Sequence, residues 1–208
     1  MRKIVFGLFS ALGLALPAAA QDPVLPVAEE QIARGLLMQH DGKMIFAPCR
    51  DRSYANVEDV SPGAAVTVAL GELGLADGKN LYVEFLGKSE GGNLRVSAVN
   101  FARTETRCQQ PGGTEESWRA AGNGPAWSLA VGAGQLLLKR AGKPDLQLAH
   151  GEIRSEGTTT QIPTAEKATA EWRFYRQICR DKGASMLFGW QAELKVDGEV
   201  LKGCAWQR

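Results

Sequence analysis

Apolar and polar residues alternate over several short runs in the first half of the chain, a pattern typical of β-strands. We expect five strands there, at residues 34–39, 43–47, 53–57, 81–86 and 94–101. Asp41-Gly42 lies between the first two runs and predicts a tight hairpin turn. The first half of the chain is therefore expected to form a small β-sheet.

The period changes to that of a helix after Ser61-Pro62, where serine suits the N-cap and proline suits the first helical position. Val66, Leu70 and Leu73 then fall on one helical face. Three strands, a helix and two strands is the element order of a five-stranded OB-like barrel. An open five-stranded sheet with one helix has the same order and stays an alternative.

The second half is almost wholly strand-like, with turn residues at roughly ten-residue spacing. Asp197-Gly198 predicts a hairpin between the last two strands. We expect strands at residues 126–131, 135–139, 145–149, 158–162, 168–179, 190–196 and 200–205. Such a run of short strands predicts a small meandering β-domain, curled into a half-barrel.

The N-terminus has the features of a signal peptide. Arg2 and Lys3 precede an apolar run, and small residues lead to an expected cleavage site after Ala20. The apolar run is too short for a membrane span, although an N-terminal anchor is the alternative. The expected division of the chain is a signal peptide at 1–20, an extended lead-in at 21–32, an OB-like domain at 33–108, a linker at 109–120 and a β-domain at 121–208.

Charge and cysteine content narrow the class of protein. The chain has 24 Lys and Arg against 23 Asp and Glu, so it lacks the basic excess that nucleic acid binding requires. Four cysteines in an exported chain indicate two disulfides, for which three connectivities exist. We expect Cys49–Cys108 and Cys179–Cys204, because each pair stays within one half of the chain. No short C-x-x-C spacing points to zinc or to a redox pair.

The chain offers few residues for catalysis. His40 and His150 are its two histidines, and no serine lies in a nucleophile-elbow context. His150 has the same parity as Leu146 and Leu148, so it is either a general base or ligand, or a half-buried histidine at a strand end. We expect no catalytic residues.

Met38, His40 and Met44 form a soft set of side chains that could hold copper(I). A turn at Asp41-Gly42 pairs His40 with Lys43 and therefore directs Met44 to the opposite face from Met38 and His40. We therefore expect no metal or other cofactor, and Met38 and His40 stay weak candidates.

Five tryptophans are present, four of them in the β-domain expected at 121–208, and they serve either as core or as an aromatic platform for a ligand. The polar loop after Cys179 is the most site-like stretch, because binding residues concentrate on loops of rigid scaffolds. The candidate ligand-binding residues are Arg180, Asp181, Ser185, Met186, Trp127 and Trp190.

Scattered positions in both halves resemble those of known bacterial envelope families. They are Gly122 to Leu129, Cys179 to Met186 and Leu201 to Ala205 in the second half, and Gly35, Phe46 to Cys49, Tyr54 and Leu81 to Gly87 in the first. The second half resembles proteins with a META/HslJ-like β-domain, and the first half resembles the OB-like domain of the copper-linked lipoprotein NlpE. There are departures: the chain lacks a lipidation cysteine and an N-terminal C-x-x-C, and its loop has Ala184 where methionine is expected before serine.

Expected export, two disulfides and the lack of a convergent catalytic set favour a non-enzymatic periplasmic protein. It would bind a partner or ligand of the envelope, in envelope maintenance or stress response, with no nucleic acid partner and no membrane span. The alternatives are a hydrolase that uses His150, a copper binder that uses Met38 and His40, and an inhibitor of a cell-wall hydrolase.

Overall fold

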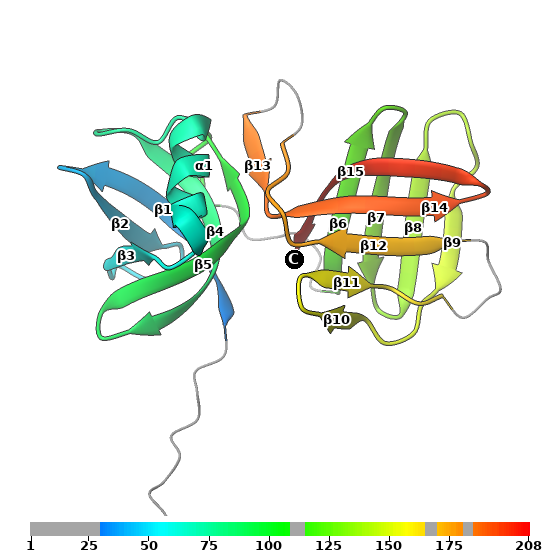
Figure 1. Ribbon diagram of the computed structural model, residues 1–208, viewed down its shortest axis with the longest axis horizontal. Helices are drawn as coiled ribbons and strands as arrows, with labels where there is room; N and C mark the ends of the chain where they lie inside the picture. Colours follow the sequence, from blue (N-terminus) through cyan, green and yellow to red (C-terminus); the bar gives the residue numbers. More distant parts are fainter. Residues whose placement is uncertain (1–29, 109–114, 165–169, 181–184) are drawn as a thin grey trace, which may run out of the picture.

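The computed structural model describes residues 30–108, 115–164, 170–180 and 185–208. These residues form two β-structures that lie side by side (Figure 1): a closed five-stranded barrel with a short helix, and a nine-stranded half-barrel. Both expected folds are confirmed. No helix in this part of the chain is long and apolar enough to cross a membrane.

The barrel has OB-like topology, because β5 pairs with β3 in parallel and with β4 in antiparallel orientation, and β4 pairs back onto β1. The hairpin register is the expected one, with His40 opposite Lys43. The elements are β1 (Gln31–His40), β2 (Lys43–Pro48), β3 (Ala55–Asp59), the 3₁₀ turn η1 (Pro62–Ala64), α1 (Ala65–Leu73), β4 (Asn80–Glu90) and β5 (Asn93–Arg103).

The half-barrel is a single antiparallel sheet in the order β10-β11-β12-β14-β15-β6-β7-β8-β9. Its inner face carries the alternating apolar residues of each strand. Strands β6 and β10 were not expected from the sequence and add to the strands that were. The elements are β6 (Glu116–Asn123), β7 (Ala126–Gly132), β8 (Gln135–Arg140), β9 (Leu146–Ala149), β10 (Arg154–Glu156), β11 (Thr159–Gln161), β12 (Glu171–Tyr175), β14 (Trp190–Val196) and β15 (Glu199–Gln207).

Two expected boundaries need correction. β1 begins at Gln31, so the end of the expected lead-in at 21–32 is strand. β6 begins at Glu116, inside the expected linker at 109–120. Trp118 and Ala120 are the cause, since both are buried in the half-barrel core and draw this polar stretch into the sheet. Residues 109–114 of that linker, and the expected signal peptide, lie outside the described residues.

The helix starts later than expected. A 3₁₀ turn follows Ser61, and α1 itself begins at Ala65, so Ser61 is not its N-cap residue. The Ser61 hydroxyl still accepts a hydrogen bond from the amide of Val66, at 3.1 Å. Asp59, at the end of β3, accepts hydrogen bonds from Ser61 and from the amide of Thr67, the latter at 2.8 Å. The carboxylate of Asp59 therefore ties α1 to the barrel wall.

The segment between β12 and β14 crosses from the half-barrel to the barrel. Its strand β13 (Met186–Phe188) pairs antiparallel with the end of β5, beyond the stretch where β5 pairs with β3 (Figure 1). Leu187 is fully buried within the apolar core of the barrel. The expected division placed residues 121–208 together, but this strand belongs to the barrel sheet.

The barrel in turn contributes apolar residues to the core of the half-barrel. Leu86 of β4, which is 7% exposed, belongs to the apolar core of the half-barrel, and Ile32 and Ala98 pack against the same core. These residues lie on the outer surface of the barrel, so the barrel wall covers apolar surface of the half-barrel. Each domain therefore completes the core of the other.

Gly189 allows the close approach of the two domains where β13 turns into β14. Its amide donates a hydrogen bond to the carbonyl of Asn100, at 2.9 Å. A Cβ atom at this position would lie 1.8 Å from the carbonyl oxygen of Val99. Only glycine fits such a contact without a shift of the backbone.

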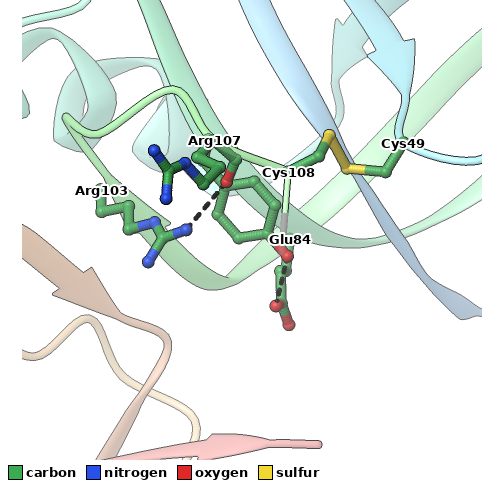
Figure 2. The surroundings of a disulfide bond; sticks show 6 residues. Cys49, Glu84, Arg103, Arg107 and Cys108 are labelled. Carbon is green, nitrogen blue, oxygen red and sulfur yellow. Dashed lines mark hydrogen bonds between the residues drawn. A yellow bond between two sulfur atoms is a disulfide. The ribbon is translucent and has the colours of Figure 1, made fainter. Parts of the chain in front are cut away.

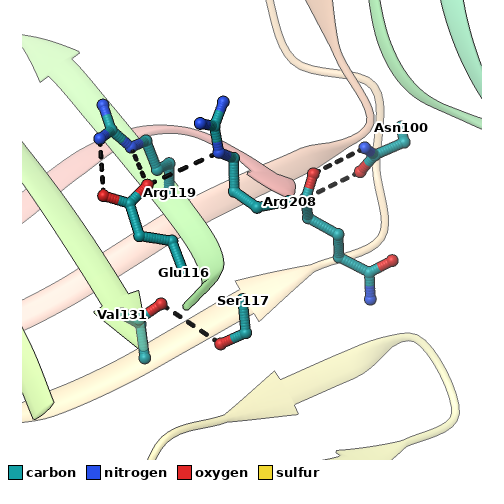
Figure 3. Close-up of polar contacts among 7 residues, drawn as sticks. Asn100, Glu116, Ser117, Arg119, Val131 and Arg208 are labelled. Atoms are coloured by element: carbon teal, nitrogen blue, oxygen red, sulfur yellow. Dashed lines mark hydrogen bonds and ion pairs between the residues drawn. The ribbon is translucent and has the colours of Figure 1, made fainter. Parts of the chain in front are cut away.

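Polar contacts add to the interface on its C-terminal side (Figure 3). The side-chain amide of Asn100 donates to the carbonyl of Gln207 at 2.9 Å, and its oxygen accepts from the Gln207 amide at 2.8 Å. Arg119 and Arg208 both contact Glu116 nearby, at 2.6 and 3.5 Å. Asn100 thus binds the main chain of the last strand as a neighbouring strand would.

Asn100 also donates to Glu84, which is 7% exposed. The carboxylate of Glu84 accepts from the Tyr82 hydroxyl at 2.8 Å and lies 3.4 Å from Arg34. Burial, and then the neighbouring charge of Glu84, raise the pKa of Tyr82 above its usual value. This buried carboxylate is therefore stabilised by two hydrogen-bond donors, Tyr82 and Asn100, and by an ion pair with Arg34.

The expected disulfides are both present, as Cys49–Cys108 and Cys179–Cys204. Cys49–Cys108 joins the end of β2 to the segment after β5, where Arg103 donates to the carbonyl of Arg107 (Figure 2). Closing a loop of 59 residues contributes about 4 kcal/mol in the chain-entropy account. Two disulfides are typical of proteins from oxidising, exported compartments.

Replacement of Asp59 by asparagine tests the helix tether. Burial alone would raise the pKa of Asp59, but hydrogen bonds from Ser61 and Thr67 outweigh it and hold the pKa below the usual value. A lowered folded-state pKa stabilises the fold above the unfolded-state pKa, and this contribution is lost as the pH falls through the folded-state pKa. We expect Asp59→Asn to lower the free energy of unfolding by about 1 kcal/mol at pH 7.

That difference between the wild type and Asp59→Asn should shrink as the pH falls below about 4, measured by urea denaturation over a pH series. Asp145→Asn, at an exposed position, is the matched control. A difference that stays constant over the acidic range would contradict the tether.

Candidate functional site

A cleft of about 590 Å³ lies on the outer face of the half-barrel sheet, beside the segment that crosses to the barrel. Strands β6, β12, β14 and β15 contribute its lining, together with Cys179, Arg180 and Phe188. The volume falls within the range of small-molecule sites, roughly 300–1,000 Å³. It is therefore the candidate functional site.

Small residues form the floor of the cleft. Gly203 and Cys204 of β15 lie next to Ala121 of β6, and all three line the cleft. A Cβ atom at Gly203 would lie 2.1 Å from the carbonyl oxygen of Ala121 and 2.8 Å from the ring of Trp127. Glycine at 203 therefore lets β15 lie close to β6 and to Trp127, and the small outward side chain of Ala121 leaves the hollow open.

The rim carries two ion pairs. Arg180 lies 2.6 Å from Glu72 of α1 and also donates to the carbonyl of Ala69, at 2.8 Å. Lys202 lies 3.8 Å from Glu193 on the neighbouring strand. Arg180 therefore connects the edge of the cleft to the helix of the other domain.

The disulfide Cys179–Cys204 fixes the crossing segment to the floor of the cleft. Cys179 also pairs with Phe188 through two backbone hydrogen bonds, at 2.8 and 2.9 Å. One covalent bond and one backbone bridge thus hold both ends of this segment against β15. The position of Arg180 follows directly from this attachment.

The structure brings only some of the predicted site residues together. Arg180 lines the cleft. Ser185 and Met186 contact the barrel instead: the Ser185 carbonyl accepts from the amide of Thr104, and Met186 lies opposite Arg103. Asp181 lies outside the described residues.

Trp127 and Trp190 do not form an accessible aromatic platform, and this prediction is corrected. They are 5% and 6% exposed and belong to the half-barrel core. Trp190 packs edge-on against Trp118 with 4.9 Å between ring centroids. Their parity on the strands directs both rings inward, as expected for the large residues of a small β-core.

His150 lies at the end of β9, and its position is that of a strand-end histidine. Its amide donates to the carbonyl of Gly134 at 2.9 Å, and its Nδ1 lies 2.7 Å from the carbonyl oxygen of Gly151. Among the described residues it makes no ion pair with a carboxylate. It does not line the cleft.

Met38 and His40 share a face of the β1–β2 hairpin, whereas Met44 lies opposite Gln39 and points to the other face, as expected. The His40 ring is exposed and lies 3.5 Å from Asp41. Within the part of the chain that the structure covers, no group of three or more His, Cys, Asp or Glu side chains is arranged to hold a metal ion.

Sequence analysis missed Tyr175 and Gln191, which lie opposite each other on β12 and β14 and line the cleft. A signal was available, because both residues alternate with the inward-facing Phe174 and Trp190. Tyr175 and Gln191 face outward and lie close in sequence or in the sheet to the predicted disulfide Cys179–Cys204. Polar outward-facing residues beside such a disulfide could have indicated the site.

Comparisons with protein-family models, with curated proteins and with solved structures find no match to this chain. The argument for function therefore depends on the geometry of the cleft.

Arg180→Ala tests the link between the cleft and α1. Loss of its contacts to Glu72 and Ala69 should lower the free energy of unfolding by about 1 kcal/mol. It should also accelerate hydrogen exchange at the amides of β13, measured by mass spectrometry. Arg52→Ala, at an exposed position of the barrel, is the control. Equal exchange in both variants would rule out this link.

Proposed function

We propose that the protein is a non-enzymatic periplasmic binding protein that takes a ligand, or a group of a partner protein, into the cleft beside Cys179–Cys204. The observation that carries the proposal is the cleft itself, with its small-residue floor and its position between a disulfide and an interdomain ion pair. Such a rigid hollow is pre-organised, so little ordering is needed on binding.

The lining favours binding over catalysis. Its described residues include amide, phenol and small side chains, and Glu193 is the carboxylate among them. Glu193 lies 3.8 Å from Lys202, and the described lining contains no histidine, the side chain most often used as a general acid or base.

Export and cleavage after Ala20 belong to the same proposal. The two disulfides support an oxidising compartment, and the resemblance to NlpE-like and META/HslJ-like envelope domains supports a role in envelope maintenance or stress response. Inhibition of a cell-wall hydrolase is one form that such a role can take, with the cleft receiving a group of the hydrolase.

A fragment screen by protein-observed NMR tests the proposal. We expect fragments to shift the backbone amides of Tyr175, Gln191 and Lys202. Ala121→Trp should abolish these shifts, because Ala121 is exposed on the cleft floor and a tryptophan there fills the hollow. Gln147→Trp, on exposed β9 of the same sheet, is the matched control and should keep them.

The circular dichroism spectra of both variants should match that of the wild type, which checks that both are folded. Fragment shifts that survive in Ala121→Trp, or a screen that leaves the cleft amides unchanged, would refute a binding role for this cleft.

A further inference from the structure

We infer that the ligand is uncharged, with an apolar face and a hydroxyl or amide edge, the chemistry of a neutral oligosaccharide. This inference rests on the proposed binding role of the cleft and specifies its ligand. Three features carry it: the strands are paired with each other along the row of side chains that crosses the cleft, the charges of the cleft are already paired, and its remaining polar groups lie in that row beside an apolar floor.

The main chain of the floor is paired along the line from Tyr175 to Ala121, although β15 pairs with β6 only over Cys204–Gln207. Strands β14, β15 and β6 each have a neighbour on both sides: β12 and β15, β14 and β6, and β15 and β7 (Figure 1). An extended peptide binds by strand addition only at an unpaired edge. Along the paired stretch from Tyr175 to Ala121, recognition therefore depends on side chains.

The charged side chains of the lining have partners of opposite sign. Arg180 is paired with Glu72 at 2.6 Å, and Lys202 with Glu193 at 3.8 Å. The cleft consequently carries no net charge that would attract an ion of either sign. An uncharged ligand can enter without separating these pairs.

A row of four side chains crosses the cleft. Cross-strand pairing places Tyr175 opposite Gln191, Gln191 opposite Cys204, and Cys204 opposite Ala121. Directly paired residues of an antiparallel sheet point to the same face. With neighbouring strands about 4.8 Å apart, the row extends over roughly 14 Å. This length suits a short chain of linked rings.

The row has a polar half and an apolar half. Within the described part of the chain, the side chains of Tyr175 and Gln191 make no hydrogen bond, so a phenol and an amide are available to hydroxyl groups. Ala121 and the Cys179–Cys204 disulfide provide apolar contact, and Tyr175 adds ring surface. Sugar rings combine an apolar C–H face with hydroxyl edges, which matches this division.

Titration of the mature protein with chitotriose, an uncharged trimer of N-acetylglucosamine, tests the inference by NMR. Cellotriose and maltotriose serve as further neutral trisaccharides. At least one of the three should shift the amides of the row. Gln191→Leu and Tyr175→Phe should each weaken its binding about tenfold, through lost hydrogen bonds. Gln147→Leu, on the same sheet outside the cleft, should leave the affinity unchanged.

Two further probes separate this inference from the proposed function: an acetylated trialanine amide, as a neutral peptide, and octanoate, as an apolar anion. If either binds in the cleft and no trisaccharide does at about 10 mM, the saccharide assignment is overturned and the binding role stands. If no probe shifts the cleft amides, both are overturned. Saccharide binding that is unaffected by Gln191→Leu and Tyr175→Phe overturns the assignment to this row.

Discussion

The burial of Leu187 in the barrel core is the interaction on which the rest of the structure depends. Leu187 belongs to a segment whose two ends are anchored in the half-barrel, yet it packs against residues of the barrel. Leu86 makes the reverse contact from the barrel wall into the half-barrel core. Full burial of one such side chain contributes about 1.5–3 kcal/mol, so the exchange stabilises the two domains as one unit.

The cleft follows from this exchange. The crossing segment has to leave the half-barrel sheet in order to place Leu187, and Cys179–Cys204 fixes the point where it leaves. Beside this point the outer face of the sheet keeps a hollow over the small side chain of Ala121. The same constraint places Arg180 against α1, so the candidate site and the domain interface share residues. The contacts that hold the two domains together therefore also shape the hollow.

The sequence predicts most strands of this fold because their apolar residues alternate over five or more positions, as in β14. It does not predict β13, whose three residues show no alternation and pair with a strand far away in the chain. The site is predicted in part. The polarity of the loop at Arg180 and the cysteine before it indicated that part of the site. On β14, the prediction chose Trp190, whose side chain points into the core, instead of its outward-facing neighbour Gln191. The row from Tyr175 to Ala121 forms only when four strands pair in the folded sheet, so the sequence alone does not predict it.

Urea denaturation of Leu187→Ala, followed separately in each domain by NMR, tests the coupling most directly. The amides of Leu37 and Leu138 report on the barrel and the half-barrel. The account predicts coincident transitions in the wild type, and a loss of about 2–5 kcal/mol in Leu187→Ala that both amides report equally. A half-barrel transition that keeps the wild-type midpoint in Leu187→Ala would show that the two domains fold independently.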